Sequence, residues 1–139
     1  MVEILLDIEP MGAVRVTSKG KFSERAVKYH HWMATVKWLW VKECLDRGYS
    51  KNFVLPGVIE YIEFGLSIND PDKKGNKGAV HLVGKPYMKK PDLDNLYKAF
   101  IDAVCYKGDD SHIWCVNGMR KVYSNYGKGY IFVKFKNEE

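Results

Sequence analysis

The sequence predicts an α+β fold: a single compact domain over residues 1–139, with a mixed sheet and two main helices. Two long segments show the apolar period of amphipathic helices, and several short segments rich in β-branched and aromatic residues show the alternation of strands. Their order along the chain is β-α-β-(β)-α-β-β. With 139 residues, 46% of them hydrophobic, the chain can bury a core of its own.

The first two elements are a strand and a long helix. The apolar density of residues 2–8 predicts a short buried strand, which ends at Pro10. Ser23 is a suitable N-cap for a helix from Glu24 to about Arg47, because no Pro or Gly interrupts this segment.

Apolar side chains cover more of this helix than one small domain can easily bury. One stripe has spacings of three and four residues and consists of Tyr29, Trp32, Met33, Val36 and Trp40. A second set widens the apolar surface and consists of Val27, Ala34, Trp38, Val41 and Leu45. An exposed remainder favours self-association, so we expect a homodimer. The alternative is that these side chains simply form the core.

The rest of the chain predicts a second helix among strands. A half-buried strand is expected between residues 58 and 68, turns from 69 to 77, and a further short strand between 78 and 88. The second helix begins near Pro91, and its apolar residues recur with helical period at Leu93, Leu96, Tyr97, Phe100, Ile101 and Val104. Two closing strands near 119–123 and 130–135 are expected to form a hairpin through 124–129.

The charge of the chain favours a polyanionic partner. The formal net charge is +5, and one segment with almost no acid carries Lys73, Lys74, Lys77, Lys85, Lys89 and Lys90. Because this run directly precedes an acidic motif, a phosphate-facing role is favoured over a solvated loop. The chain has no run of eighteen apolar residues and no basic leader, so we expect a soluble, cytoplasmic protein without membrane contact. Three widely spaced cysteines predict neither a disulfide framework nor a zinc site.

The acidic motif lies at the start of the second helix. Asp92 and Asp94 can direct two carboxylates toward one point, and the turn at Asp109 and Asp110 can supply a third. Crowded carboxylates repel one another unless a hard cation lies among them, and such oxygen sites suit Mg²⁺. A cation there, or a pair of cations about 4 Å apart, would make water a competent nucleophile and stabilise the phosphate and the leaving 3′-oxygen. The motif therefore indicates phosphodiester hydrolysis.

Lys98 lies one helical turn beyond Asp94, where it can contact the phosphate or the attacking water. Its alternative role is an ion pair with Asp94 worth about 0.3–0.5 kcal/mol. Asp102 shares this face but lies about 12 Å from Asp94 along the helix axis, so we expect it to support the site indirectly.

An Asp-x-Asp pair alone is a weak signal. Asp94 could be the helix N-cap, with Asp92 interacting with the helix dipole. Phosphatases that form an aspartyl phosphate need the pair at the end of a buried strand, whereas here it follows a lysine-rich segment. The histidines, His30, His31, His81 and His112, match no familiar metal-ligand spacing and are assigned to packing or surface.

The residues from Lys90 to Leu96, with Lys98, Asp102-Ala103-Val104 and Asp109-Asp110-Ser111, resemble the signature of RusA-type crossover junction endodeoxyribonucleases, a Holliday junction resolvase family common in phages. The resemblance covers roughly a fifth of the chain. It implies a homodimeric, Mg²⁺-dependent nuclease of DNA recombination and repair that nicks four-way DNA junctions. Mn²⁺ is expected to substitute for Mg²⁺. By resemblance, Asp92, Asp94 and Asp110 are the metal ligands and catalytic acids, and Lys98 is the catalytic lysine, while Asp109 remains an alternative to Asp110.

Basic side chains are expected to contact DNA phosphates without reading the base sequence. These candidates are Arg15, Lys19, Lys21, Lys89, Lys90, Arg120 and Lys121. Two alternatives stay open: a nuclease for other branched DNA such as flaps and forks, and a junction-binding module that does not cut.

Overall fold

The computed structural model describes residues 1–15, 23–68, 81–105, 110–125 and 127–136. Within these residues it shows an α+β chain with a mixed sheet and two helices, as the sequence predicts. The chain packs as two compact units. The sheet unit comprises Met1–Pro10, Pro56–Lys90 and Ile113–Glu139, and the helix unit comprises Met11–Leu55 and Pro91–His112.

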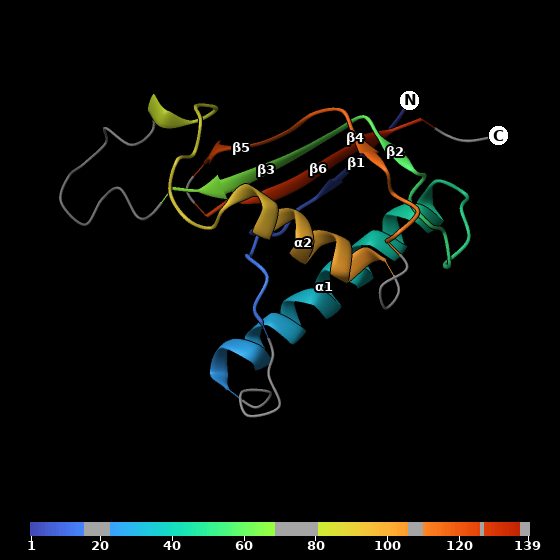
Figure 1. The fold of residues 1–139 in the computed structure, drawn as a ribbon, viewed down its shortest axis with the longest axis horizontal. Coiled ribbons are helices and arrows are strands. Elements are labelled where there is room, and N and C mark those ends of the chain that lie inside the picture. Colours follow the sequence, from blue (N-terminus) through green and yellow to red (C-terminus); the bar gives the residue numbers. More distant parts are fainter. Residues whose placement is uncertain (16–22, 69–80, 106–109, 126, 137–139) are drawn as a thin grey trace. The chain divides into compact units, whose positions relative to one another are not determined.

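The sheet unit is built on four strands, which run side by side in the order β1-β6-β3-β5 (Figure 1). Their bounds are Val2–Leu6 for β1, Tyr61–Ser67 for β3, Met119–Ser124 for β5 and Tyr130–Phe135 for β6. Strand β6 is antiparallel to β1 and β3, whereas β3 and β5 are parallel. A smaller parallel pair joins β2 (Val58–Ile59) to β4 (Cys115–Val116).

Side chains alternate across this sheet, as the period of two requires. One face is apolar and buried, and its members are Ile4, Leu6, Ile62, Phe64, Leu66, Ile131, Val133 and Phe135. On the opposite face the register aligns Leu5 with Phe132, Phe132 with Glu63, and Glu63 with Arg120. Burial on one side only explains why these strands alternate in sequence.

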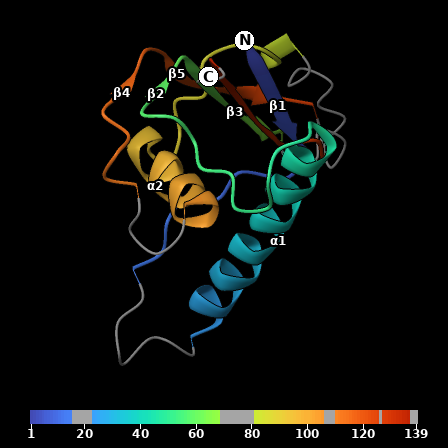
Figure 2. The same cartoon turned by 90° about the vertical axis from the view of Figure 1, so that its right-hand side faces the viewer.

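The helix unit consists of α1 (Glu24–Asp46) and α2 (Leu93–Val104), which pack against each other (Figure 2). Ser23 is the N-cap of α1, as predicted, and its Oγ accepts a hydrogen bond from the Ala26 N–H at 3.2 Å. Trp40 packs edge-on against Phe100 with ring centroids 6.1 Å apart. Lys37 Nζ donates to the carbonyl of Val104 at 3.3 Å, so α1 caps the C-terminal end of α2.

Three predictions of local structure are wrong. The expected single strand over 58–68 is divided at Glu60, because β2 pairs with β4 whereas β3 joins the main sheet. In the described part of 78–88, Pro86 forms only an isolated bridge to Val122, and proline cannot donate to a ladder. The closing strands form no hairpin, because β3 lies between β5 and β6. The predicted turns at 69–77 lie outside the described residues.

In the part of the chain that the structure describes, neither helix combines the length and the apolar character needed to cross a bilayer.

A close contact in the sheet unit gives a first prediction. A Cβ at Gly65 would overlap the ring of Tyr130, whose hydroxyl donates to Glu63. Gly65→Ala should therefore lower the free energy of unfolding by about 4 kcal/mol, through crowding plus loss of that hydrogen bond. Alanine's better backbone propensity offsets less than about 1 kcal/mol.

Urea unfolding would measure this loss. Tyr130→Phe is the matched control, because it keeps the ring and deletes only the hydrogen bond; it should cost about 2 kcal/mol. Equal stabilities of Gly65→Ala and the wild type would contradict the close packing of Tyr130 over Gly65.

Candidate active site

Asp92 and Asp94 lie at the start of α2 with exposed side chains. Asp92 is the N-cap, and its backbone carbonyl accepts from the N–H groups of Asn95 and Leu96, both at 3.1 Å. Its carboxylate makes no capping hydrogen bond. Asp94 is in the first turn. The sequence alternative had Asp94 as the N-cap, whereas the structure has Asp92 in that position. Because neither carboxylate forms a salt bridge with the described residues, both remain available to a ligand.

Lys98 and Asp102 follow Asp94 along α2 at intervals of four residues, and both are exposed. Among the described residues, Lys98 forms no salt bridge with Asp94 or with Asp102. The ion-pair role considered for Lys98 is thus not observed. Its ammonium group is free to meet an anion from outside the chain.

The loop that carries Arg15 is held against the start of α2. Ala13 N–H donates to the Asn95 carbonyl at 3.2 Å, and Asn95 Nδ2 donates to the Ala13 carbonyl, also at 3.2 Å. A Cβ at Gly12 would lie 2.9 Å from both Asn95 Nδ2 and Pro91 Cβ, so only glycine permits this approach. Arg15, two residues after Ala13, is exposed. Ala13 is thereby fixed at the start of α2, and the cationic Arg15 follows it two residues later in the chain.

Asp110 belongs to the turn that follows α2 and is exposed. Burial raises the pKa of Tyr97 on α2, and the charges of Cys105 and Asp110 raise it further. Asp110 is therefore electrostatically coupled to the helix that carries the other two acids. Asp109, the alternative third ligand, lies outside the described residues.

The described residues contain no group of three His, Cys, Asp or Glu side chains arranged to hold a metal ion, so Asp92, Asp94 and Asp110 are not drawn together. The donor set itself suits a hard cation, because all three groups are exposed aspartates that form no salt bridge within the described part of the chain.

Tyr29 of α1 is a residue that sequence reasoning treated only as apolar. It is 4% exposed, and its hydroxyl has no hydrogen-bond partner of standard geometry among the described residues. Burial raises the pKa of Tyr29 to about 12, and the nearby Asp102 carboxylate contributes. Asp102 is therefore coupled to a buried phenol, which accords with the supporting role expected for it.

The basic residues expected to contact DNA differ in how free they are. Arg15, Lys89 and Lys90 are exposed. Arg120 is bound to Glu63 and lies 5.7 Å over the ring of Tyr61. Lys121 donates to the carbonyl of Lys89. These last two contacts give Arg120 and Lys121 structural roles besides any with DNA, and Lys19 and Lys21 lie outside the described residues.

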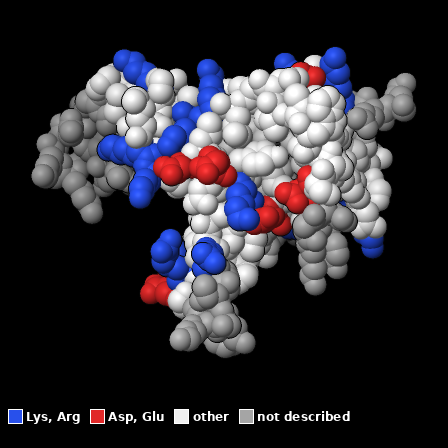
Figure 3. All heavy atoms as spheres, in the orientation of Figure 1, with Lys and Arg blue, Asp and Glu red and all other residues white. Residues whose placement is uncertain are grey.

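Charges of both signs reach the surface, as the face drawn in Figure 3 shows.

The partly buried carboxylate of Glu63 was not singled out from the sequence. Burial alone would raise its pKa, but hydrogen bonds from Tyr130, Tyr61 and Arg120 outweigh this and hold the pKa below its usual range. Only the register of β3 with β5 and β6 brings these partners together, so no local signal could have revealed them.

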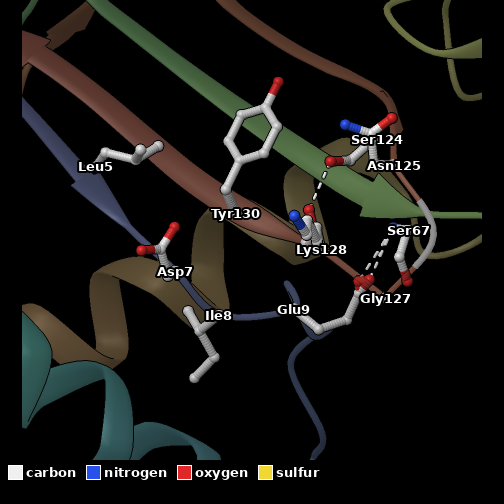
Figure 4. A pocket seen from close by; sticks show the side chains of 11 residues that line it. Leu5, Asp7, Ile8, Glu9, Ser67, Ser124, Asn125, Gly127, Lys128 and Tyr130 are labelled. Carbon is white, nitrogen blue, oxygen red and sulfur yellow. Dashed lines mark hydrogen bonds between the residues drawn. The ribbon is translucent and has the colours of Figure 1, made fainter.

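A hollow of about 740 Å³ lies in the sheet unit beside the carboxyl ends of β1, β3 and β5 (Figure 4). Glu9 accepts the backbone N–H of Ser67 there, and Ser124 Oγ donates to the carbonyl of Lys128. Asp7 and Lys128 bring opposite charges to its lining. These polar groups are largely used within the chain, and the mixed charge favours no single class of ligand.

No protein-family model, curated protein or solved structure matches this chain.

The coupling of Tyr29 to Asp102 is testable by titration. The phenol should titrate near pH 12 in the wild type, and Asp102→Asn should lower its pKa while burial keeps it above 10. Because the folded-state pKa is raised, the associated stability is present below pH 10 and is lost as the pH rises through 12. NMR of ¹³Cζ-labelled tyrosine would measure the pKa.

Asp46→Asn is the control, because Asp46 is an exposed acid at the far end of α1 from Tyr29. It should leave the pKa of Tyr29 unchanged. A Tyr29 pKa that is the same in Asp102→Asn and the wild type would contradict the coupling.

Proposed function

We propose that the chain is a metal-dependent endodeoxyribonuclease of the RusA type, which hydrolyses phosphodiesters at four-way DNA junctions. One observation carries the proposal: the carboxylates of Asp92 and Asp94 are exposed at the start of α2 and form no salt bridge with any described residue, and Asn95 holds the Arg15 loop beside them. This combination suits a site that needs both a cation and a phosphate.

Asp92, Asp94 and Asp110 would hold Mg²⁺, or Mn²⁺ in its place. The cation supplies Lewis acidity toward a phosphate oxygen and makes water more acidic. The protein's part would be to offer three oxygen donors, none of which forms a salt bridge with the described residues. The dipole of α2 places positive potential at the end of the helix where Asp92 and Asp94 lie.

Lys98 would bind a non-bridging oxygen of the scissile phosphate, since it is exposed and forms no salt bridge among the described residues. Arg15 would bind a neighbouring phosphate from the loop held on Asn95. Water adds to phosphorus, the bond from phosphorus to the 3′-oxygen breaks, and the products are a 3′-hydroxyl and a 5′-phosphate. Lys98 stabilises the charge that develops on the phosphate oxygens during this step.

The four-way junction as substrate comes from the resemblance alone. Flaps and forks present the same phosphate chemistry, and phosphate contacts by Arg15, Lys89 and Lys90 would serve any of them. A module that binds junctions without cutting is the other class, and the ungrouped carboxylates of Asp92, Asp94 and Asp110 favour it.

Cleavage of a synthetic four-way junction in Mg²⁺ separates these functions. Asp92→Asn and Asp94→Asn should each lower the rate at least 100-fold, because each removes a charged metal ligand, and junction binding should be retained. Denaturing gels would measure cutting, and mobility shifts in Ca²⁺ would measure binding.

Asp46→Asn removes an exposed acid of α1 and should cut at the wild-type rate. If junctions stay intact at enzyme excess and every variant binds them as well as the wild type, the nuclease proposal is wrong and the function is that of a binding module. Faster cutting of flaps or forks than of junctions would move the substrate assignment to those structures.

We also propose that the protein is a homodimer formed through α1. The exposed fractions of Val27, Trp38 and Leu45 are 55%, 62% and 53%. With Ala34 and Val41 they recur at spacings of seven, four, three and four residues, which lie in one stripe along a helix. In an antiparallel pair centred between Ala34 and Trp38, each small Ala34 would face the large Trp38 of the partner. Such alternation of sizes allows close packing.

Trp38→Glu should shift the dimer to monomer at micromolar concentration, because it buries a charge in an apolar seam. Sedimentation velocity would measure the change. Trp38→Phe keeps the apolar character and should remain dimeric. A wild type that sediments as a monomer would contradict the pairing.

A further inference from the structure

A second cavity lies in the helix unit, beside the C-terminal end of α2. Its volume is about 570 Å³, within the range of sites that hold small ligands. Its lining is Lys37, Lys51, Asn52, Phe53, Val54, Val104, Cys105, Ser111 and His112. Two lysines line the cavity, and no Asp or Glu is among the described residues that do so.

No carboxylate of the described residues forms a salt bridge with either lysine. Lys37 is partly buried and donates to the Val104 carbonyl at 3.3 Å, which occupies one of its three N–H groups. Lys51 is exposed and forms no hydrogen bond or ion pair with the described residues. The C-terminal end of α2 contributes a charge of about −0.5, which the two ammonium groups outweigh. The cavity therefore attracts an anion.

The other side chains of the lining indicate which chemical group is attached to the bound anion. Phe53 stacks on Tyr49 with ring centroids 4.3 Å apart, and Val54 and Val104 add aliphatic surface. His112 Nε2 lies 2.6 Å from the Leu55 carbonyl, which holds the segment after α2 at the cavity. An apolar wall beside two lysines suits a phosphate with a flat, partly apolar group attached, which is the chemistry of a nucleotide.

We infer that this cavity binds one phosphate and its adjoining nucleotide. That the nucleotide belongs to a DNA strand rests on the proposed function; a free nucleotide has the same chemistry. Asp94 and Val104 are separated by about 15 Å along α2, at 1.5 Å per residue. At 3.4 Å per nucleotide of a B-form strand, the bound phosphate would lie about four nucleotides from the scissile one.

Binding can be tested without cleavage. Backbone NMR of the protein, titrated with a dT₁₀ oligonucleotide in the absence of divalent metal, should shift the amides of residues 51–54, 104–105 and 111–112. Parallel titrations with dTMP and with inorganic phosphate identify the source: a preference for dT₁₀ indicates a strand, and equal affinity for dTMP indicates a free nucleotide. Absence of shifts at these amides with all three ligands would overturn the inference.

Matched variants assign the binding to the cavity. Val54→Glu places a carboxylate in the wall and should weaken binding at least tenfold, whereas Val54→Gln has the same shape without the charge and should change it less than threefold. Val54 is 55% exposed, so neither variant should impair folding. Equal affinities of the two variants would contradict a phosphate at this wall.

Salt dependence supplies a second measurement. Lys51→Gln should reduce the slope of log affinity against log salt by about 0.7 with dT₁₀, as expected for one lost phosphate contact on a single strand. Lys42→Gln, on the exposed side of α1, should leave the slope unchanged. Equal slopes in Lys51→Gln and the wild type would contradict the contact.

Failure of this inference is distinguishable from failure of the proposed function. If the protein cuts junctions but Val54→Glu and Val54→Gln bind dT₁₀ equally well, the proposed function stands and the inference about the cavity is wrong. If the protein binds dT₁₀ through the cavity but cuts no branched DNA, the inference about the cavity stands and the proposed nuclease function is wrong.

Discussion

The start of helix α2 stabilises negative charge, and that interaction determines what the acidic end of this helix can do. Asp92 and Asp94 lie where the helix dipole favours carboxylates by about 0.3–1 kcal/mol each. Neither carboxylate forms a salt bridge with the described residues. An internal lysine or arginine would have satisfied the same charges and blocked a cation. Among the described residues, Asp92 and Asp94 therefore stay available to the cation that the proposed function requires.

The surroundings of these acids are organised by contacts within the helix unit. Asn95 binds both the N–H and the carbonyl of Ala13, so the loop that carries Arg15 is attached to the first turn of α2. At the other end of the helix, Lys37 satisfies the Val104 carbonyl, and Trp40 packs on Phe100 between the two ends. A phosphate strand that followed α2 would thus meet the loop that carries Arg15 near one end, Lys98 midway along the helix, and Lys37 and Lys51 near the other end.

Local signals in the sequence predicted the elements well and their partners less well. Ser23 as N-cap, the helix that begins at Glu24 and the helical period from Leu93 to Val104 are local features, and the structure confirms them. The hairpin failed because the insertion of β3 between β5 and β6 depends on pairing between segments distant in sequence. For the same reason two further features could not be predicted from the sequence: the hydrogen bonds that Tyr61, Tyr130 and Arg120 donate to Glu63, and the cavity lined by Lys37 and Lys51. The exposed positions of Asp92, Asp94 and Lys98 at and along α2 follow from the local helical pattern, whereas their role in a metal site stays a prediction.

The central claim is that Asp92, Asp94 and Asp110 bind a divalent cation, and Mn²⁺ tests it directly because its unpaired electrons broaden nearby NMR signals. Substoichiometric Mn²⁺ added to the protein with a catalytically inert branched DNA should broaden the amide signals of residues 92–95 and 110–111 most strongly, and the Asp92→Asn/Asp94→Asn double variant should lose this effect. Undiminished signals at these residues, or broadening centred on Asp7 and Glu9 in the sheet unit, would contradict the claim.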